Sequence, residues 1–257
     1  MRIDAVLRRT ILFLLLAVLL PACASTPEST ADATNNPPPK YTLASFGLEE
    51  DEETTINVYD PIEPANRAIY KFNAMFDRAI FLPVTDLYAF LTPVFVQERV
   101  TDFFSNLSEL GTFANSILQG KVERASRALV RFAVNSTVGL AGLFDPMTAL
   151  GTRQEREDFG QTLGVWGVGD GPYLVLPFFG PSNLRDTTGL AGDYAAYQAV
   201  DPFGLASFED DHPEMTVLRV LDTRLTTKAR YYQTGTPFEY DLVRLLYTQV
   251  RKLEIQK

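Results

Sequence analysis

The chain has 257 residues, a formal net charge of −9 at pH 7, one histidine and one cysteine. Such an acidic protein is a poor candidate for binding a nucleic-acid backbone, which relies on clusters of Lys and Arg. A single histidine and a single cysteine also argue against a zinc site, because zinc ions in proteins take three or four His, Cys or carboxylate ligands.

The first 23 residues have the order of a bacterial export signal. Three arginines flank the start, an apolar run covers residues 11–20, and the small residue Ala22 comes directly before Cys23. The run is too short for a membrane-spanning helix, which needs roughly 20 residues. The segment resembles a lipobox, which implies that residues 1–22 are a cleaved signal peptide and that Cys23 is acylated. An ordinary secreted protein with a cysteine near the cleavage site is the alternative.

Acylation of Cys23 predicts an anchored protein, because several acyl chains together hold a protein stably at a bilayer. Ala24 follows the cysteine. In lipoproteins of Gram-negative bacteria an aspartate at this position is the usual inner-membrane retention signal. Its absence favours the outer membrane, with the protein facing the periplasm.

Residues 23–56 are expected to form a lipidated flexible tether. The segment contains small polar residues, three consecutive prolines at 37–39 and an acidic block at 49–53. It carries too little apolar surface to offset the entropy of ordering, and its proline-rich part favours an extended spacer. The acidic block is either a docking site for a partner or simply solvated.

Residues 57–257 are predicted to form a mainly α-helical domain, because apolar residues recur there at spacings of three and four. The first helix starts at Asp60-Pro61 and ends at Pro83, and two more cover 96–110 and 117–133. In the third, the apolar face lies opposite three arginines. Further helices start at 211–214 and after 235–237. In the last helix leucines mark one face, and Tyr240, Val243, Tyr247 and Val250 form a second face that either contacts lipid or packs on another element.

The segment 163–180 is apolar, with Asp170 as its only charge. Its length suits a membrane span, but its glycines and prolines would disrupt a straight helix. Two interpretations remain: a core hairpin or loop in a soluble domain, or a bent apolar element in or beside the bilayer.

Eight motifs carry a resemblance to a known family. They are 60–67 (Asp-Pro-Ile-Glu-Pro-Ala-Asn-Arg), 70–73 (Tyr-Lys-Phe-Asn), 104–107, 118–120, 131–139, 158–164 (Asp-Phe-Gly-Gln-Thr-Leu-Gly), 167–173 and 184–186. In register over about 60–193, they resemble the VacJ/MlaA family of outer-membrane lipoproteins, whereas the C-terminal third matches only in its helical character. The resemblance implies a ring- or donut-like helical domain in the inner leaflet, with a central amphipathic channel. It also implies association with a trimeric porin and transfer of mislocalised phospholipid to a soluble periplasmic carrier protein.

A polar lumen would give the lipid headgroup a solvated path, since an unpaired charge is costly in hydrocarbon. We expect the segment 163–180 to line this path, with bends at its glycines, apolar side chains as the wall and Asp170 near the mouth. The predicted path residues are Val165, Trp166, Gly167, Gly169, Asp170, Gly171, Tyr173, Leu174, Leu176 and Phe178. Phe72 and Asn73 are predicted to pack against or gate the path; alternatively, Phe72 is core and Asn73 satisfies a polar contact.

The sequence favours a non-enzymatic protein without a metal or cofactor. A Ser-His-Asp triad would need His212, which stands at a predicted helix start, and no Gly-x-Ser-x-Gly elbow is present. The segment 167–171 lacks the Lys-Ser/Thr of a phosphate-binding loop. Asp158 and the Arg185-Asp186 pair are expected to be ion pairs or helix caps. An envelope lipid hydrolase and a structural porin-associated lipoprotein remain as alternatives.

Overall fold

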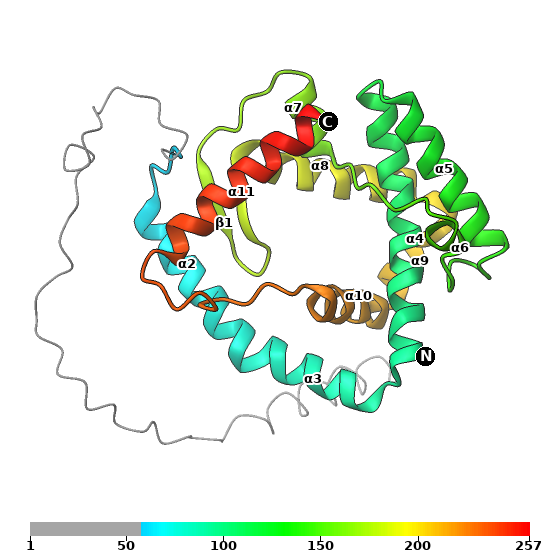
Figure 1. Cartoon of the computed structure of the whole chain (residues 1–257), viewed down its shortest axis with the longest axis horizontal. Coiled ribbons are helices and arrows are strands. Elements are labelled where there is room, and N and C mark those ends of the chain that lie inside the picture. The colour runs from blue at the N-terminus through cyan, green and yellow to red at the C-terminus, as the bar shows by residue number, and fades with distance from the viewer. Residues whose placement is uncertain (1–57) are drawn as a thin grey trace, which may run out of the picture. The chain divides into compact units, whose positions relative to one another are not determined.

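The computed structural model describes residues 58–257, which belong to one compact unit. The signal peptide, Cys23 and the tether lie outside the described residues. The described part is mainly helical, as predicted, and its elements follow one another around a ring (Figure 1). The helices are α2 (Glu63–Phe76), α3 (Leu82–Leu91), α4 (Val94–Leu118), α5 (Val122–Thr137), α6 (Pro146–Ala149), α7 (Phe159–Val165), α8 (Leu184–Val200), α9 (Leu205–Asp211), α10 (Pro213–Thr226) and α11 (Glu239–Gln256). The π-helical turn η2 (Asp77–Phe81) joins α2 to α3, and the 3-10 turn η3 (Pro202–Gly204) joins α8 to α9.

The first helix differs from its prediction at both ends. It begins at Glu63, and the Asp60 side chain, expected to cap it, instead accepts a hydrogen bond from Asn66 Nδ2 at 2.8 Å. Helical structure also continues through Pro83, where an end was predicted. The π-helical turn η2 comes directly before α3, so Pro83 lies in the first turn of α3, where its missing N–H leaves no bond unmade.

The predicted third helix is divided between two elements. Residues 117–118 end α4, and the rest belongs to α5 after a turn at Gly120, whose φ of +72° favours glycine. The two helices pack against each other along their polar faces. Arg131, expected opposite the packing face, is buried against Glu109 of α4, while Leu129 and Val130 are exposed.

The segment 163–180 contains a helix end, a turn and most of a β-hairpin. Strands β1 (Tyr173–Leu176) and β2 (Gly180–Asn183) are antiparallel, with Tyr173 opposite Asn183 and Leu176 opposite Gly180. The side chains of Tyr173 and Val175 are buried with those of Tyr70 and Tyr240 in the aromatic core, which thus joins the hairpin to α2 and α11. Residues 173–183 thus form a hairpin packed on the core, and a position of the segment in or beside a bilayer stays a prediction.

Helices α7 and α8 approach each other closely at a pair of glycines. A Cβ atom on Gly189 would lie 2.3 Å from the backbone nitrogen of Gly160, closer than any side chain tolerates. The contact places Asp158, which caps α7 by accepting from Gln161 N, near the start of α8.

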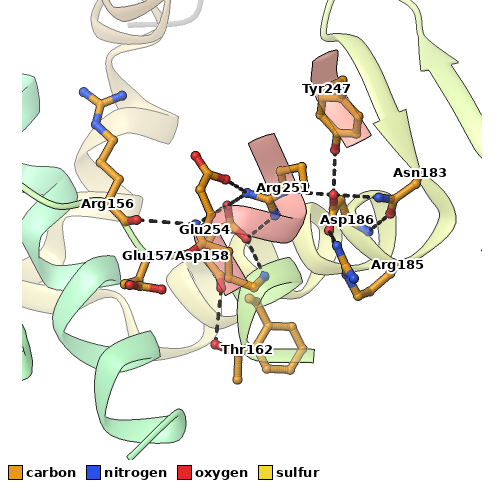
Figure 2. Close-up of polar contacts among 12 residues, drawn as sticks. Arg156, Glu157, Asp158, Thr162, Asn183, Arg185, Asp186, Tyr247, Arg251 and Glu254 are labelled. Atoms are coloured by element: carbon orange, nitrogen blue, oxygen red, sulfur yellow. Dashed lines mark hydrogen bonds and ion pairs between the residues drawn. The ribbon is translucent and has the colours of Figure 1, made fainter. Parts of the chain in front are cut away.

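The C-terminal helix is attached to α7 and α8 by ion pairs of Arg251, shown in Figure 2; the Asp186 partner is buried, whereas the Asp158 side chain is 43% exposed. Arg251 donates two hydrogen bonds to Asp158, at 2.8 and 2.9 Å, and one to Asp186 at 2.9 Å. Tyr247 Oη donates to the same Asp186, which also pairs with Arg185. The expectation that Asp158 and Arg185-Asp186 form a cap and ion pairs is confirmed.

The structure shows how the second face of α11 is used, for which the sequence left contact with lipid or packing on another element open. Tyr240 is buried in the aromatic core, and Val243 and Tyr247 pack against it. The leucines Leu242, Leu246 and Leu253, by contrast, are exposed. Three of the four residues of the second face therefore pack on other elements, whereas the fourth, Val250, is exposed like the leucines.

Within residues 58–257, no single helix combines the length and apolarity needed to cross a membrane, but one bent pair does. It consists of the stretch Glu63–Leu91 followed by α4, which turn by 118° relative to each other.

Candidate functional site

A pocket of about 590 Å³ lies between α2, the tip of the hairpin and α10. Aromatic and aliphatic side chains form most of its wall, and charged side chains of η2 and α10 form the remainder. The apolar lining consists of Tyr70, Phe76, Phe81, Phe178, Phe179, Pro181, Val220, Ala229, Tyr231 and Val243. The polar lining consists of Asn73, Asp77, Arg219, Thr223, Arg224, Thr227 and Arg230.

Asn73 holds the hairpin tip against α2. Its side-chain amide donates to the carbonyl oxygen of Leu176 at 2.9 Å and accepts from the backbone N–H of Phe178 at 2.8 Å. Asn66, two helical turns earlier, binds β1 in the same way, through Tyr173 O and Val175 N at 2.9 Å each. Both amides are buried, so α2 supplies hydrogen bonds that backbone groups of β1 and the tip would otherwise lack.

The hairpin tip carries the aromatic side of the pocket. Phe178 has a φ of +68°, an unusual conformation for a residue with a side chain, and its ring packs edge-on against Phe72 and Phe76 at centroid distances of 5.4 and 4.8 Å. Phe76 in turn contacts Phe81 at 4.9 Å. These rings form a continuous apolar wall from α2 through η2 to the tip.

The charged side chains of the pocket lining are mostly paired. Asp77 is buried and accepts two hydrogen bonds from Arg224 of α10, one of them 2.7 Å long. Arg219 pairs with Glu209 of α9. Arg230 donates to the carbonyl oxygens of Thr227 and Ala229, at 2.5 and 3.2 Å.

The exposed surface of residues 58–257 is unusually apolar, whereas much of the interior is polar. The buried residues include more polar or charged side chains than apolar ones, with Glu109, Thr112, Asn115 and Ser116 on one face of α4. Large apolar side chains are exposed along α3, the start of α4, α5 and the segment 138–150. The group comprises Leu87, Phe90, Leu91, Val94, Phe95, Val122, Leu129, Val130, Val138, Leu140, Leu143 and Leu150. A monomer in water seldom exposes apolar area on this scale, which marks a surface that contacts lipid or another protein.

The family model described as MlaA lipoprotein matches residues 58–254. The chain belongs to the MlaA family. The match covers the whole described part apart from its last three residues, so it includes the C-terminal helices that the sequence motifs alone did not cover.

Curated relatives in the MlaA family cover part of the chain. The Escherichia coli (strain K12) protein named "Intermembrane phospholipid transport system lipoprotein MlaA" is 35% identical over 138 residues, which are 52% of this chain and 55% of that protein. The Haemophilus influenzae protein of the same name is 33% identical over 54% of this chain and 56% of that one. A Rickettsia prowazekii protein, "Uncharacterized protein RP093", is 39% identical over 57% and 58%, respectively. The matched part thus spans somewhat more than half the length of these relatives.

A solved structure matches more of the chain. It is described as "Structural basis for maintenance of bacterial outer membrane lipid asymmetry", and it covers 76% of this chain and 98% of its own, with a TM-score of 0.63 and 29% identity. The mainly helical fold predicted from the sequence agrees with this structural match.

The motifs that resemble the MlaA family make several of the contacts that join the elements to one another. Asn66 and Asn73, from the motifs at 60–67 and 70–73, bind the strand and the tip that follow the motif at 167–173. Arg131, from the motif at 131–139, makes the buried pair with Glu109. These motifs therefore specify how the ring is joined.

The predicted path residues are spread over a wider region than the pocket. Of the ten, all within the described part, Phe178 belongs to its lining. Tyr173 is in the aromatic core, Leu174 and Leu176 are half-buried, and the stretch 165–169 is exposed beyond the end of α7. Asp170 pairs with the buried Arg185.

Trp166 Nε1, in the exposed stretch, donates to Leu118 O at 3.0 Å. Gly171, between Asp170 and the first strand, approaches Leu184 closely. A role of this segment in a lipid path stays a prediction.

The predicted packing or gating pair lies at the pocket. Asn73 lines it, and Phe72 lies beside it against Phe178. The charged lining residues Asp77, Arg224 and Arg230 were not predicted from the sequence. Asp77 and Arg224 are 147 positions apart, and an aspartate within an apolar helix was the only sequence signal that pointed to a buried partner.

The only histidine lies away from the pocket. His212 immediately precedes α10, as predicted, and its Nδ1 lies 2.9 Å from the carboxylate of Glu214. The ring stacks against Phe208 and is 45% exposed. In the part of the chain that the structure describes, no group of His, Cys, Asp or Glu side chains is arranged to hold a metal ion.

Proposed function

We propose that this protein is a non-enzymatic component of retrograde phospholipid transport in a Gram-negative envelope. It removes mislocalised phospholipid from the outer leaflet of the outer membrane through an amphipathic channel and passes it to a soluble periplasmic carrier protein. Cys23 anchors it to the inner leaflet by its acyl chains, and a trimeric porin is its partner in the membrane. The relatives' name and the matched structure's description support a role in phospholipid transport and lipid asymmetry.

The observation that carries the proposal is the pocket between α2 and α10. The pocket combines an aromatic wall with the charged side chains of Asp77, Arg224 and Arg230, so acyl chains and a charged headgroup each find a compatible surface. The apolar outer surface of α3, α4 and α5 supports placing this pocket at bilayer depth. The segment 163–180 contributes its tip, Phe178, to the wall, and we propose that the remaining predicted path residues line an approach to it.

Two matched variants of α10 test the proposal. Val220 lines the pocket, whereas Val217, on the same helix, is exposed outside the lining. In a strain lacking the gene, outer-leaflet phospholipid and detergent sensitivity are expected to rise. Val220→Trp should fail to reverse this rise because the indole fills the pocket, whereas Val217→Trp should reverse it fully. Unchanged lipid asymmetry in the deletion strain, or equal complementation by the two variants, would contradict the proposal.

The anchor has its own test. Cys23→Ser should leave the protein untethered and inactive, and rescue of the deletion strain by this soluble variant would show that the anchor is dispensable.

An envelope lipid hydrolase is the second candidate, and His212 decides it. A hydrolase that relies on its only histidine would lose activity in His212→Ala, whereas a passive conduit should complement fully. The exposed position of His212 and its pairing with Glu214 favour the conduit. The third candidate is a purely structural porin-associated lipoprotein. A photo-crosslinker placed at position 178 distinguishes it from a lipid conduit, because a structural protein would give no phospholipid adduct.

A further inference from the structure

The charges that line the pocket are not balanced. Asp77 uses both carboxylate oxygens on Arg224, and Arg219 is neutralised by Glu209. Arg230 contacts no carboxylate among the described residues and donates only to two backbone carbonyl oxygens. The lining therefore holds one cation without a counterion and no carboxylate free to receive a second cation, although the chain as a whole is acidic.

The hydrogen bonds of Arg230 also orient it. Its Nη1 donates to both carbonyl oxygens, of Thr227 and Ala229, so the guanidinium is held against the turn that follows α10. Its Nε and Nη2 are without a protein partner in the described part, and they form the edge of the fork that donates two parallel hydrogen bonds to a phosphate. A group already held in this way loses little conformational freedom when it binds.

We propose that Arg230 binds the phosphodiester of a phospholipid at this pocket, and that it makes the pocket prefer anionic headgroups over zwitterionic ones. The inference rests on the proposed function and names the lipid class. A phosphatidylglycerol headgroup brings one negative charge and no cation. The ammonium of phosphatidylethanolamine would meet the positive field of Arg230 and find Asp77 already occupied by Arg224.

The test measures which lipid the full-length acylated protein retains. The purified protein is incubated with mixed micelles of equimolar phosphatidylglycerol and phosphatidylethanolamine, and the bound lipids are quantified by mass spectrometry. The wild type should retain more phosphatidylglycerol, and Arg230→Gln should lower the ratio about threefold, the effect of one partly exposed ion pair. Arg230→Lys, which keeps the charge but lacks the fork, should retain part of the preference.

Lys228→Gln is the matched control. Lys228 is an exposed cation in the same turn, two residues away, but does not line the pocket, so its loss should leave the ratio unchanged. An unchanged ratio in Arg230→Gln, or an equal fall in Lys228→Gln, would overturn the inference. So would displacement of the bound lipid by excess inorganic phosphate, because the site would then bind free phosphate. A wild-type protein that retains no phospholipid would instead refute the proposed function itself.

Discussion

The aromatic core and the interface between α4 and α5 differ in the kind of side chain that they bury. The core joins α2, the hairpin and α11 through Tyr70, Tyr173, Val175 and Tyr240, as expected of a protein in water. The α4–α5 interface buries Glu109 and Arg131 beside the small side chains of Ala125 and Ala128, whereas the larger Leu129 and Val130 of α5 are exposed.

The two buried charges of this interface, Glu109 and Arg131, form an ion pair, while the second carboxylate oxygen of Glu109 has no hydrogen-bond partner in the described part. Arg131 donates to Glu109 at 2.5 Å, to Asp145 at 2.9 Å and to Thr148 at 3.2 Å, so little of its hydrogen-bonding capacity is left unused. Apolar side chains on the outer face gain from an apolar surrounding, which agrees with the proposed location at the bilayer. The comparison teaches that one chain is adapted to two environments, and the following changes test it.

Removing Arg131 should cause the largest loss of stability. Arg131→Met leaves Glu109 buried without a cation and should lower the free energy of unfolding by about 4 kcal/mol, measured by denaturant titration in detergent. Arg127→Met is the control, because Arg127 lies on the same helix but pairs with exposed Glu123 and Glu155, and it should cost about 0.5 kcal/mol. Equal effects of the two variants would contradict the importance of the polar interface. Adding Glu109→Leu to Arg131→Met should restore most of the loss, because no buried charge then remains unpaired.

The attachment of α11 should depend on Arg251 nearly as strongly. Arg251→Met leaves Asp158 and Asp186 without their main cation and should cost about 3 kcal/mol. The exposed neighbour Lys252→Met should change the free energy of unfolding little. If both variants unfold at the same denaturant concentration, the ion pairs do not hold α11 in place.

The same ion pairs predict a pH dependence. Burial raises the pKa values of Asp158 and Asp186, but hydrogen bonds from Arg251, and for Asp186 from Tyr247, outweigh burial and leave both pKa values below the ordinary range. Carboxyl groups whose pKa is lower in the folded state stabilise the protein above the unfolded pKa of about 3.9, and this stabilisation is lost as the pH falls below that value. Unfolding of the wild type should therefore become steeply easier below about pH 4, and Arg251→Met should flatten this dependence.

A methyl group at the α7–α8 contact should have a smaller effect. Gly189→Ala forces the helices apart at Gly160 and should cost about 2 kcal/mol. Gly111→Ala is the control, since a Cβ there meets nothing within 4 Å, and it should stabilise α4 by up to about 1 kcal/mol. Stabilisation by Gly189→Ala in thermal unfolding would show that the close approach is not required.

Changes on the apolar outer face should affect folding least. Leu129→Gln with Val130→Gln should alter the free energy of unfolding in detergent by less than about 0.5 kcal/mol, because both side chains are already exposed. The double variant should bind phospholipid vesicles more weakly in a flotation assay, whereas Glu123→Gln on the same helix should not. If the double variant and Glu123→Gln float with vesicles to the same extent, this face does not contact lipid.

Local patterns in the sequence were enough to predict the helical class and several helix starts. Asp158 and the region around His212 were identified because capping is encoded within a few residues. The eight motifs over about 60–193 were enough for the resemblance to the family, and they include side chains that join the elements of the ring, such as Asn66 and Asp158. Apolar periodicity, however, does not tell whether the apolar face of a helix packs in the protein interior or is exposed on the outside. The outward leucines of α11 and the outward apolar face of α5 therefore required the structure.

Which residues form the pocket could be seen only from the tertiary structure. Asn73 contacts the hairpin tip more than 100 positions away, and Asp77 meets Arg224 across an even longer separation. A single sequence carries no record of such pairs, because it orders residues along the chain while burial, charge balance and hydrogen bonding depend on which elements meet. The structure was likewise needed to see that Arg230 has no carboxylate partner in the described part, because this depends on which charged residues its neighbours Arg219 and Arg224 pair with.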